Sequence, residues 1–157
     1  LTIHAGKSSI DVPVRKKPET EKKVEWKEPE AAEPVKLKHV AKAFHKREAK
    51  TNAETGEWTR EIVDDFGRQV ISDIGVEIYG AGREKYRILP DDPLSARMET
   101  HWTEERKRGA WHTRTETYGR LEATATHWIV WGKIEAYEGK KKVFEKEFSE
   151  HIERKLQ

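Results

Sequence analysis

Between residues 95 and 150, apolar and polar side chains alternate with a period of two, which is typical of β-strands that bury one face. Three turn-like breaks divide this stretch, so we expect four strands joined by hairpins. Each hairpin has one pairing that best matches charge and apolarity along both strands. These pairings are Trp102 with Trp111, Leu121 with Trp128, and Val130 with Phe148.

Polar or glycine-containing segments lie where these hairpins need turns. The ERKR segment at 105–108 is expected to form the exposed tip of the first hairpin, and its four charges suit a solvated turn better than a phosphate site. Residues 123–126 are expected to form a four-residue turn in the second hairpin. The third hairpin turns at residues 138–140.

The three pairings agree on which residues share a face of the predicted sheet. A slip of one residue would move every side chain to the opposite face, so the pattern specifies the faces strongly. The charged face is predicted to carry Arg97, Glu99, Arg114, Glu116, Lys133, Glu135 and Glu145. The apolar face is predicted to carry Met98, Trp102, Trp111, Leu121, Trp128, Val130, Ile134, Phe144 and Phe148.

The pattern over residues 37–50 fits two structures. Leu37, Val40, Ala41 and Phe44 follow helical spacing and favour a short amphipathic helix. A strand would instead place Lys42 between two apolar residues on one face. The sequence leaves this choice open.

Residues 51–94 read as further strands separated by turns. The TNAETGE segment at 51–57 is typical of a turn, with Gly56 available for positive φ. Breaks are expected at Gly67, at 80–82 and at 90–93. One strand face is predicted to carry Trp58, Ile62 and Phe66, and one face of the next run Val70, Ile74, Val76 and Ile78.

The first 36 residues differ in character from the rest. Residues 1–14 alternate up to Pro13 and are expected to be the closing strand of a preceding jelly-roll domain. Residues 15–36 carry thirteen charges and three prolines among twenty-two positions, which predicts an extended linker. The sequence therefore predicts an all-β chain. A twisted antiparallel meander sheet, with a partly closed barrel as a variant, occupies residues 37–157 after a strand remnant and a charged linker.

Composition limits both the core and the partners. Charged residues make up 38% of the 157 residues, so the core must be thin and must depend on six Trp, four Tyr and four Phe. The net charge is only +2 with both signs mixed along the chain, which argues against nucleic acid or a membrane surface as a partner. No stretch approaches the ~20 apolar residues of a membrane span, and a cytoplasmic location is the default expectation.

Motifs for catalysis are missing from the sequence. No serine has glycine two residues away on both sides, as the nucleophile elbow of serine hydrolases requires. The YGAGRE segment at 79–84 lacks the Lys-Ser/Thr ending of a phosphate loop. There is no cysteine, which excludes disulfides, thiolate metal sites and cysteine nucleophiles. We therefore expect no catalytic residues, no cofactor-binding residues and no cofactor.

Two groups of side chains, a pair of histidines and three tryptophans, could serve either a binding site or the packing of the sheet. The predicted pairing sets His101 beside His112, and two imidazoles could bind zinc with Glu99 or Glu135. The same alternation puts both on the charged face, where solvated histidines are ordinary, so we expect no metal. The indoles of Trp102, Trp111 and Trp128 could line a ligand pocket, but a chain poor in aliphatic residues needs them for packing, which we favour.

Several segments resemble the C-terminal end of one enzyme family. The segments are DDPLSAR at 91–97, RGAW at 108–111, ATHW at 125–128 and EAYEGKKKVF at 135–144, within a stretch that starts at residue 85. They resemble CocE/NonD acyl esterases, α/β-hydrolases related to cocaine esterase and X-Pro dipeptidyl-peptidase. Upstream, SSIDVPVRKKP at 8–18 is similar to the closing strand and exit of the family's jelly-roll domain. Glu153 departs from the family pattern, which has proline there.

The resemblance implies a parent protein with a serine-triad α/β-hydrolase domain, a jelly-roll domain and this β-rich tail. The parent would cleave esters or amides through an acyl-enzyme, and no family catalytic residue maps onto this chain. The expected function is a non-catalytic C-terminal accessory domain that serves packing or oligomer contacts. Its partners would be the parent's hydrolase and jelly-roll domains, or further copies in a homo-oligomer. The alternatives are a free-standing ligand-binding β-barrel with a Trp-lined pocket, and a metal-dependent enzyme at His101 and His112.

Overall fold

The computed structural model describes residues 6, 9–14 and 26–155. Regular structure in this part of the chain is entirely β, with eight strands and no helix, which confirms the all-β prediction. The strands are β1 (Leu37–Ala41), β2 (Phe44–Thr51), β3 (Trp58–Ile71), β4 (Val76–Leu89), β5 (Asp92–Arg108), β6 (Trp111–Ala123), β7 (His127–Glu138) and β8 (Lys141–Glu153).

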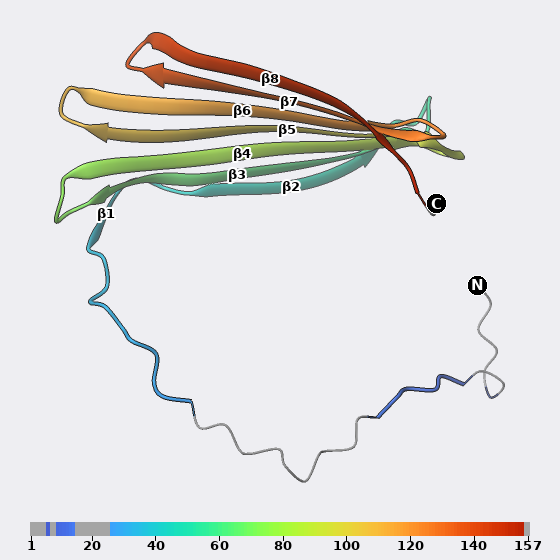
Figure 1. The fold of residues 1–157 in the computed structure, drawn as a ribbon, viewed down its shortest axis with the longest axis horizontal. Coiled ribbons are helices and arrows are strands. Elements are labelled where there is room, and N and C mark those ends of the chain that lie inside the picture. Colours follow the sequence, from blue (N-terminus) through green and yellow to red (C-terminus); the bar gives the residue numbers. More distant parts are fainter. Residues whose placement is uncertain (1–5, 7–8, 15–25, 156–157) are drawn as a thin grey trace. The chain divides into compact units, whose positions relative to one another are not determined.

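All eight strands belong to one antiparallel sheet, which is twisted and open (Figure 1). β1 and β2 lie one after the other along the same edge of β3, and β3 to β8 follow as a meander. The opposite edge is β8, which pairs with β7. Because β8 does not pair with β1 or β2, the antiparallel meander is confirmed and the barrel variant is wrong.

Residues 37–50 form two strands, which decides the choice that the pattern left open. Leu37 lies opposite Ile71 and Phe44 opposite Asp65, so β3 supplies the backbone partners of both strands. Gly67 sits in a bulge of β3 with a φ of 72°, where a Cβ would lie 2.4 Å from the carbonyl oxygen of Ala41. Only a glycine lets the chain between β1 and β2 pass this closely. Tertiary pairing thus overrides the local helical spacing.

Two of the predicted breaks before residue 90 are wrong. Gly67 bulges β3 without ending it, and residues 80–82 lie inside β4. The chain turns instead at residues 72–75, and the break predicted at 90–93 is present as a turn at Pro90–Asp91. Val70 and Val76 are consequently on different strands and on opposite faces, since Val70 pairs with Glu77 and not with Val76. The predicted turn at 51–57 is confirmed, with Gly56 at a φ of 72°.

The predicted hairpin registers are wrong by two or six positions. Trp102 lies opposite Thr117, and Trp111 lies opposite Arg108 across a two-residue turn at Gly109 and Ala110. The ERKR segment is therefore the end of β5 and not a loop. Leu121 pairs with Val130, and Gly132 with Phe148. Turn geometry decides register, and the chain makes a tight turn with a left-handed glycine at Gly109 instead of the turn expected at 105–108.

The predicted faces survive these errors, because every shift is an even number of residues. The pairings place all the residues predicted for the charged face on one side of β5–β8, and all those predicted for the apolar face on the other. We use "charged face" and "apolar face" for these two sides of the sheet. Phe66 of β3 stacks on Trp102 at 6.4 Å, so the apolar face continues beyond β5.

No strand of the sheet folds over its apolar face. No apolar side chain there is buried, and the described residues hold only two buried polar or charged side chains, Glu116 and Glu135. Trp111, Phe144 and Phe148 remain 46%, 49% and 48% exposed. Of the three indoles expected to pack in a core, Trp111 is therefore exposed, whereas Trp102 and Trp128 are half-buried. The sheet is a single layer.

The compact unit that contains the sheet begins at Pro34. Residues 9–14 form no strand and residues 26–36 no regular structure. The rest of the expected closing strand and linker, residues 1–5, 7–8 and 15–25, lies outside the described residues.

Candidate functional site

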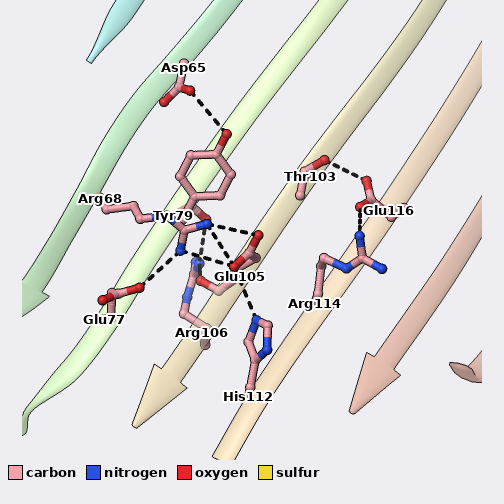
Figure 2. A network of polar contacts seen from close by, with 10 residues as sticks. All are labelled: Asp65, Arg68, Glu77, Tyr79, Thr103, Glu105, Arg106, His112, Arg114 and Glu116. Atoms are coloured by element: carbon pink, nitrogen blue, oxygen red, sulfur yellow. Dashed lines mark hydrogen bonds and ion pairs between the residues drawn. The ribbon is translucent and has the colours of Figure 1, made fainter. Parts of the chain in front are cut away.

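The densest polar network of the charged face crosses three neighbouring strands (Figure 2). Arg68 of β3 donates to Glu77 of β4 at 3.0 Å and, through both terminal nitrogens, to Glu105 of β5 at 3.1–3.2 Å. Its guanidinium lies over the ring of Tyr79 at 4.3 Å, and the Tyr79 hydroxyl donates to Asp65 at 3.2 Å. Arg68 therefore connects β3 to β5 across the strand between them.

Glu116 on β6 is the most buried carboxylate of the described residues, with 6% of its surface exposed. Its Oε1 accepts from Arg114 at 2.7 Å. Its Oε2 accepts from Thr103 at 2.6 Å and from His101 at 2.7 Å. Both oxygens are thus engaged, as a buried charge requires.

Glu135 on β7 lies directly opposite Glu116 and is 8% exposed. Two like charges at opposed positions repel, so each needs cations of its own. Glu135 accepts from Lys133 at 2.9 Å, from Tyr137 at 2.8 Å and from Lys142 at 3.2 Å. The hydrogen bonds from Lys133 and Tyr137 lower the pKa of Glu135 from 4.5 to about 2.

This pair of glutamates is poorly suited to acid–base catalysis. A carboxyl group with a pKa of about 2 is ionised at neutral pH, so Glu135 cannot donate a proton there, and it is also a weak base. Both oxygens of each carboxylate already accept hydrogen bonds from neighbouring side chains. The arrangement instead neutralises charge within the sheet and ties neighbouring strands together.

The structure separates the two histidines that the sequence placed side by side. His101 lies opposite Tyr118, on which it stacks at 4.4 Å, and His112 lies opposite Lys107. Lys107 is six positions beyond His101 along β5, so the imidazoles are on the order of 20 Å apart. His112 contacts Glu105 at 3.2 Å. The predicted pairing is wrong because the first hairpin turns at Gly109, and the described residues bring together no group of three metal-ligating side chains.

The three tryptophans do not line one pocket. Trp102 covers Gly82 of β4, Trp111 lies at the tip of the β5–β6 hairpin, and Trp128 is the second residue of β7, at the other end of the sheet. An open hollow of about 320 Å³ lies beside Trp128. Its lining includes Trp58, Tyr86, Ile88, Met98 and Leu121.

Sequence reasoning missed Trp58 as a neighbour of Trp128, and Arg68 as the partner of Glu105. Both relations join β3 to strands that follow it later in the chain. The signal that could have found them is the register of β3 with β4. That register contains a bulge at Gly67, which a strict period of two does not reveal.

Comparisons with family models, with curated proteins and with solved structures gave no significant match. Within the described ranges of the chain there is also no helix long and apolar enough to span a membrane.

Proposed function

We propose that this chain is the non-catalytic C-terminal accessory domain of a serine α/β-hydrolase of the acyl esterase or X-Pro dipeptidyl-peptidase-like type. It serves packing or oligomer contacts: its apolar face packs on a neighbouring domain of the parent protein or on another subunit. The sequence segments that resemble CocE/NonD acyl esterases lie on β5–β8 and in the turns between them.

The uncovered apolar face is the observation that carries this proposal. A large exposed apolar patch on a soluble protein usually marks an interface. Here the large side chains of that face include Trp111, Phe144, Phe148 and Ile152, all about half exposed. Each aromatic side chain can bury roughly 150–250 Å² against a partner. Because the sheet is a single layer and buries no apolar side chain among the described residues, most of the apolar surface of these side chains is available to a partner.

The composition of the charged face also indicates that the apolar face is the one that contacts the partner. The side chains of the charged face are paired into networks such as Arg68 with Glu105 and Glu116 with Arg114. Ions that are already paired and partly hydrated lose little by facing water and lose solvation by being covered. The apolar face is therefore the side that meets the partner.

The first experiment uses the longer reading frame that contains this sequence. The longer protein should react with a fluorophosphonate probe and hydrolyse p-nitrophenyl acetate, whereas residues 1–157 alone should do neither. A reactive serine within residues 1–157 would overturn the accessory role. An unreactive longer protein would overturn the hydrolase assignment.

The second experiment tests the face. Ile134→Glu places a charge in the middle of the apolar face, and the control Thr59→Glu places one on the charged face of β3, between Lys50 and Arg87. In the longer protein, Ile134→Glu should split thermal unfolding into two transitions and expose the domain to proteolysis, while Thr59→Glu should not. Circular dichroism of both variants in the 157-residue chain controls for folding. Equal behaviour of the two variants in the longer protein would count against docking through this face.

The hollow beside Trp128 favours a second candidate function, the binding of an apolar ligand. Its walls, Trp58, Tyr86 and Met98 among them, are mostly apolar. The dye 1-anilinonaphthalene-8-sulfonate should then bind this site, and Trp128→Ala should weaken binding more than Trp111→Ala. Equal loss in both variants would indicate non-specific adsorption to the apolar face.

A further inference from the structure

The edge strand β8 is unusually open. It is 13 residues long, every one of its residues is exposed, and it pairs with β7 on one side. No other described strand lies along its outer side. An edge strand of this length presents a row of backbone N–H and C=O groups that can pair with another strand, which natural proteins usually prevent by short or bulged edges. β8 runs without a bulge from Phe144 to Glu153.

The sequence of β8 is complementary to itself in one antiparallel register. With Phe148 opposite its counterpart in a second copy, Phe144 meets Ile152 and Lys146 meets Glu150 on the apolar face. On the charged face Glu145 meets His151. By symmetry each of these pairs occurs twice, and cross-strand pairs of these types are the favourable ones.

Neighbouring registers lack this match. A two-fold axis at Glu147 opposes two glutamates and sets Phe144 against Glu150. An axis at Lys146 opposes two lysines. An axis at Ser149 sets Phe148 against Glu150, and any register centred between two residues opposes apolar-face side chains to charged-face ones. The match at Phe148 therefore does not follow from composition alone.

We propose that two copies of this chain pair through β8 in the antiparallel register centred on Phe148. The paired strands join the two sheets into one, with a continuous apolar face and a continuous charged face. Lys146, which on a free edge would discourage association, selects the register by meeting Glu150 of the second copy. The inference deepens the oligomer contact of the proposed function and rests on it, but it uses the edge of the sheet and not its apolar face.

A charge swap tests the register in the 157-residue chain. Sedimentation over a range of concentrations should show a dimer of the 18.3 kDa chain. Lys146→Glu alone and Glu150→Lys alone each create two like-charge pairs and should raise the dimer dissociation constant roughly tenfold or more. The double variant, and an equimolar mixture of the two single variants, should both regain the original affinity. Single variants that dimerise like the parent chain, or a chain that is monomeric at all concentrations, would overturn the proposal.

Single cysteines test the position of the axis, and the chain contains no other thiol. Phe148→Cys places two thiols at directly opposed positions, where oxidation should link the copies. Phe144→Cys is the matched control, with the same strand, face and exposure, but its thiols would be roughly 26 Å apart. Mixing Phe144→Cys with Ile152→Cys should restore linkage. Equal linkage through position 144 alone would overturn the register.

Different results would contradict the β8 dimer and the proposed accessory role in a hydrolase. A dimer that is lost in Ile134→Glu but unchanged by the charge swaps would place the contact on the apolar face and reject the β8 edge. A β8 dimer in a longer protein without hydrolase reactivity would reject the proposed function and leave the edge pairing intact.

Discussion

Arg68 and Glu105, which are 37 residues apart in the chain, are joined by bonds from both terminal guanidinium nitrogens to the same carboxylate. The bonds span β4 (Figure 2), and the Tyr79 ring of that strand packs against the guanidinium. Because the sheet is one layer thick in the described residues, such cross-strand contacts carry stability that a buried core would otherwise supply.

Arg68→Ala should therefore destabilise the domain. Two-nitrogen pairing to a mostly covered carboxylate is worth about 1–2 kcal/mol after allowance for solvent exposure. Urea denaturation followed by tryptophan fluorescence measures the change. Arg106→Ala on β5, which removes an exposed arginine paired with the exposed Glu104, should cost less than about 0.5 kcal/mol. An equal loss of unfolding free energy in the two variants would show that the Arg68–Glu105 pair across β4 contributes no more stability than an exposed ion pair.

Glu135 should make stability depend on pH in the acid range. Its pKa is about 2 in the folded chain and 4.5 in the unfolded reference, so the unfolded state binds the proton first as pH falls. The stabilisation is complete above about pH 4.5 and is lost as pH approaches 2. The measurement is the difference in urea midpoint between the parent chain and Glu135→Gln at a series of pH values. This difference should shrink through that window, and a constant difference would contradict the assignment.

Gly82 should not tolerate a side chain. A Cβ at this position would lie 2.7 Å from ring atoms of Trp102, so Gly82→Ala must displace the indole. We expect a loss of about 1–3 kcal/mol together with a shift in tryptophan emission. Gly132→Ala is the matched control, since a Cβ there would make an ordinary contact at 3.6 Å. That control should be neutral or slightly stabilising, and the reverse order would disprove the close packing of Trp102 on β4.

Zinc should not bind at His101 and His112, because the register separates them along the sheet. Dialysis against zinc followed by metal analysis should leave no stoichiometric metal on the 157-residue chain, and the urea midpoint should not move. One retained equivalent that disappears in both His101→Ala and His112→Ala would contradict the observed register.

The alternation over residues 95–150 was enough to predict the antiparallel meander and the face of each residue assigned to the charged or the apolar face on β5–β8. This worked because side chains alternate strictly across a strand, so an error of two or six positions changes the partner and not the face. Arg114 illustrates the limit. It lies on the charged face as expected, but between Glu105 and Tyr137, not between Glu99 and Glu135.

The local sequence pattern predicted the structure least well where a segment pairs with a strand distant in the chain. Leu37 to Phe44 follow helical spacing, yet β3 provides two successive pairing sites for them. The glycines at 80 and 82 resembled a break, whereas they make room for Glu104 and Trp102 of β5. Neither relation is visible without the neighbouring strand.

The amino-acid sequence by itself determined the strand type, the two faces and the lack of catalytic motifs, because these depend on residue identity and on a period of two. The tertiary structure alone decided the registers, the burial of Glu116 and Glu135, the separation of His101 from His112 and the openness of the sheet. These depend on turn geometry and on contacts between strands far apart in the chain. The pattern of neighbouring residues does not reveal the energy of such contacts.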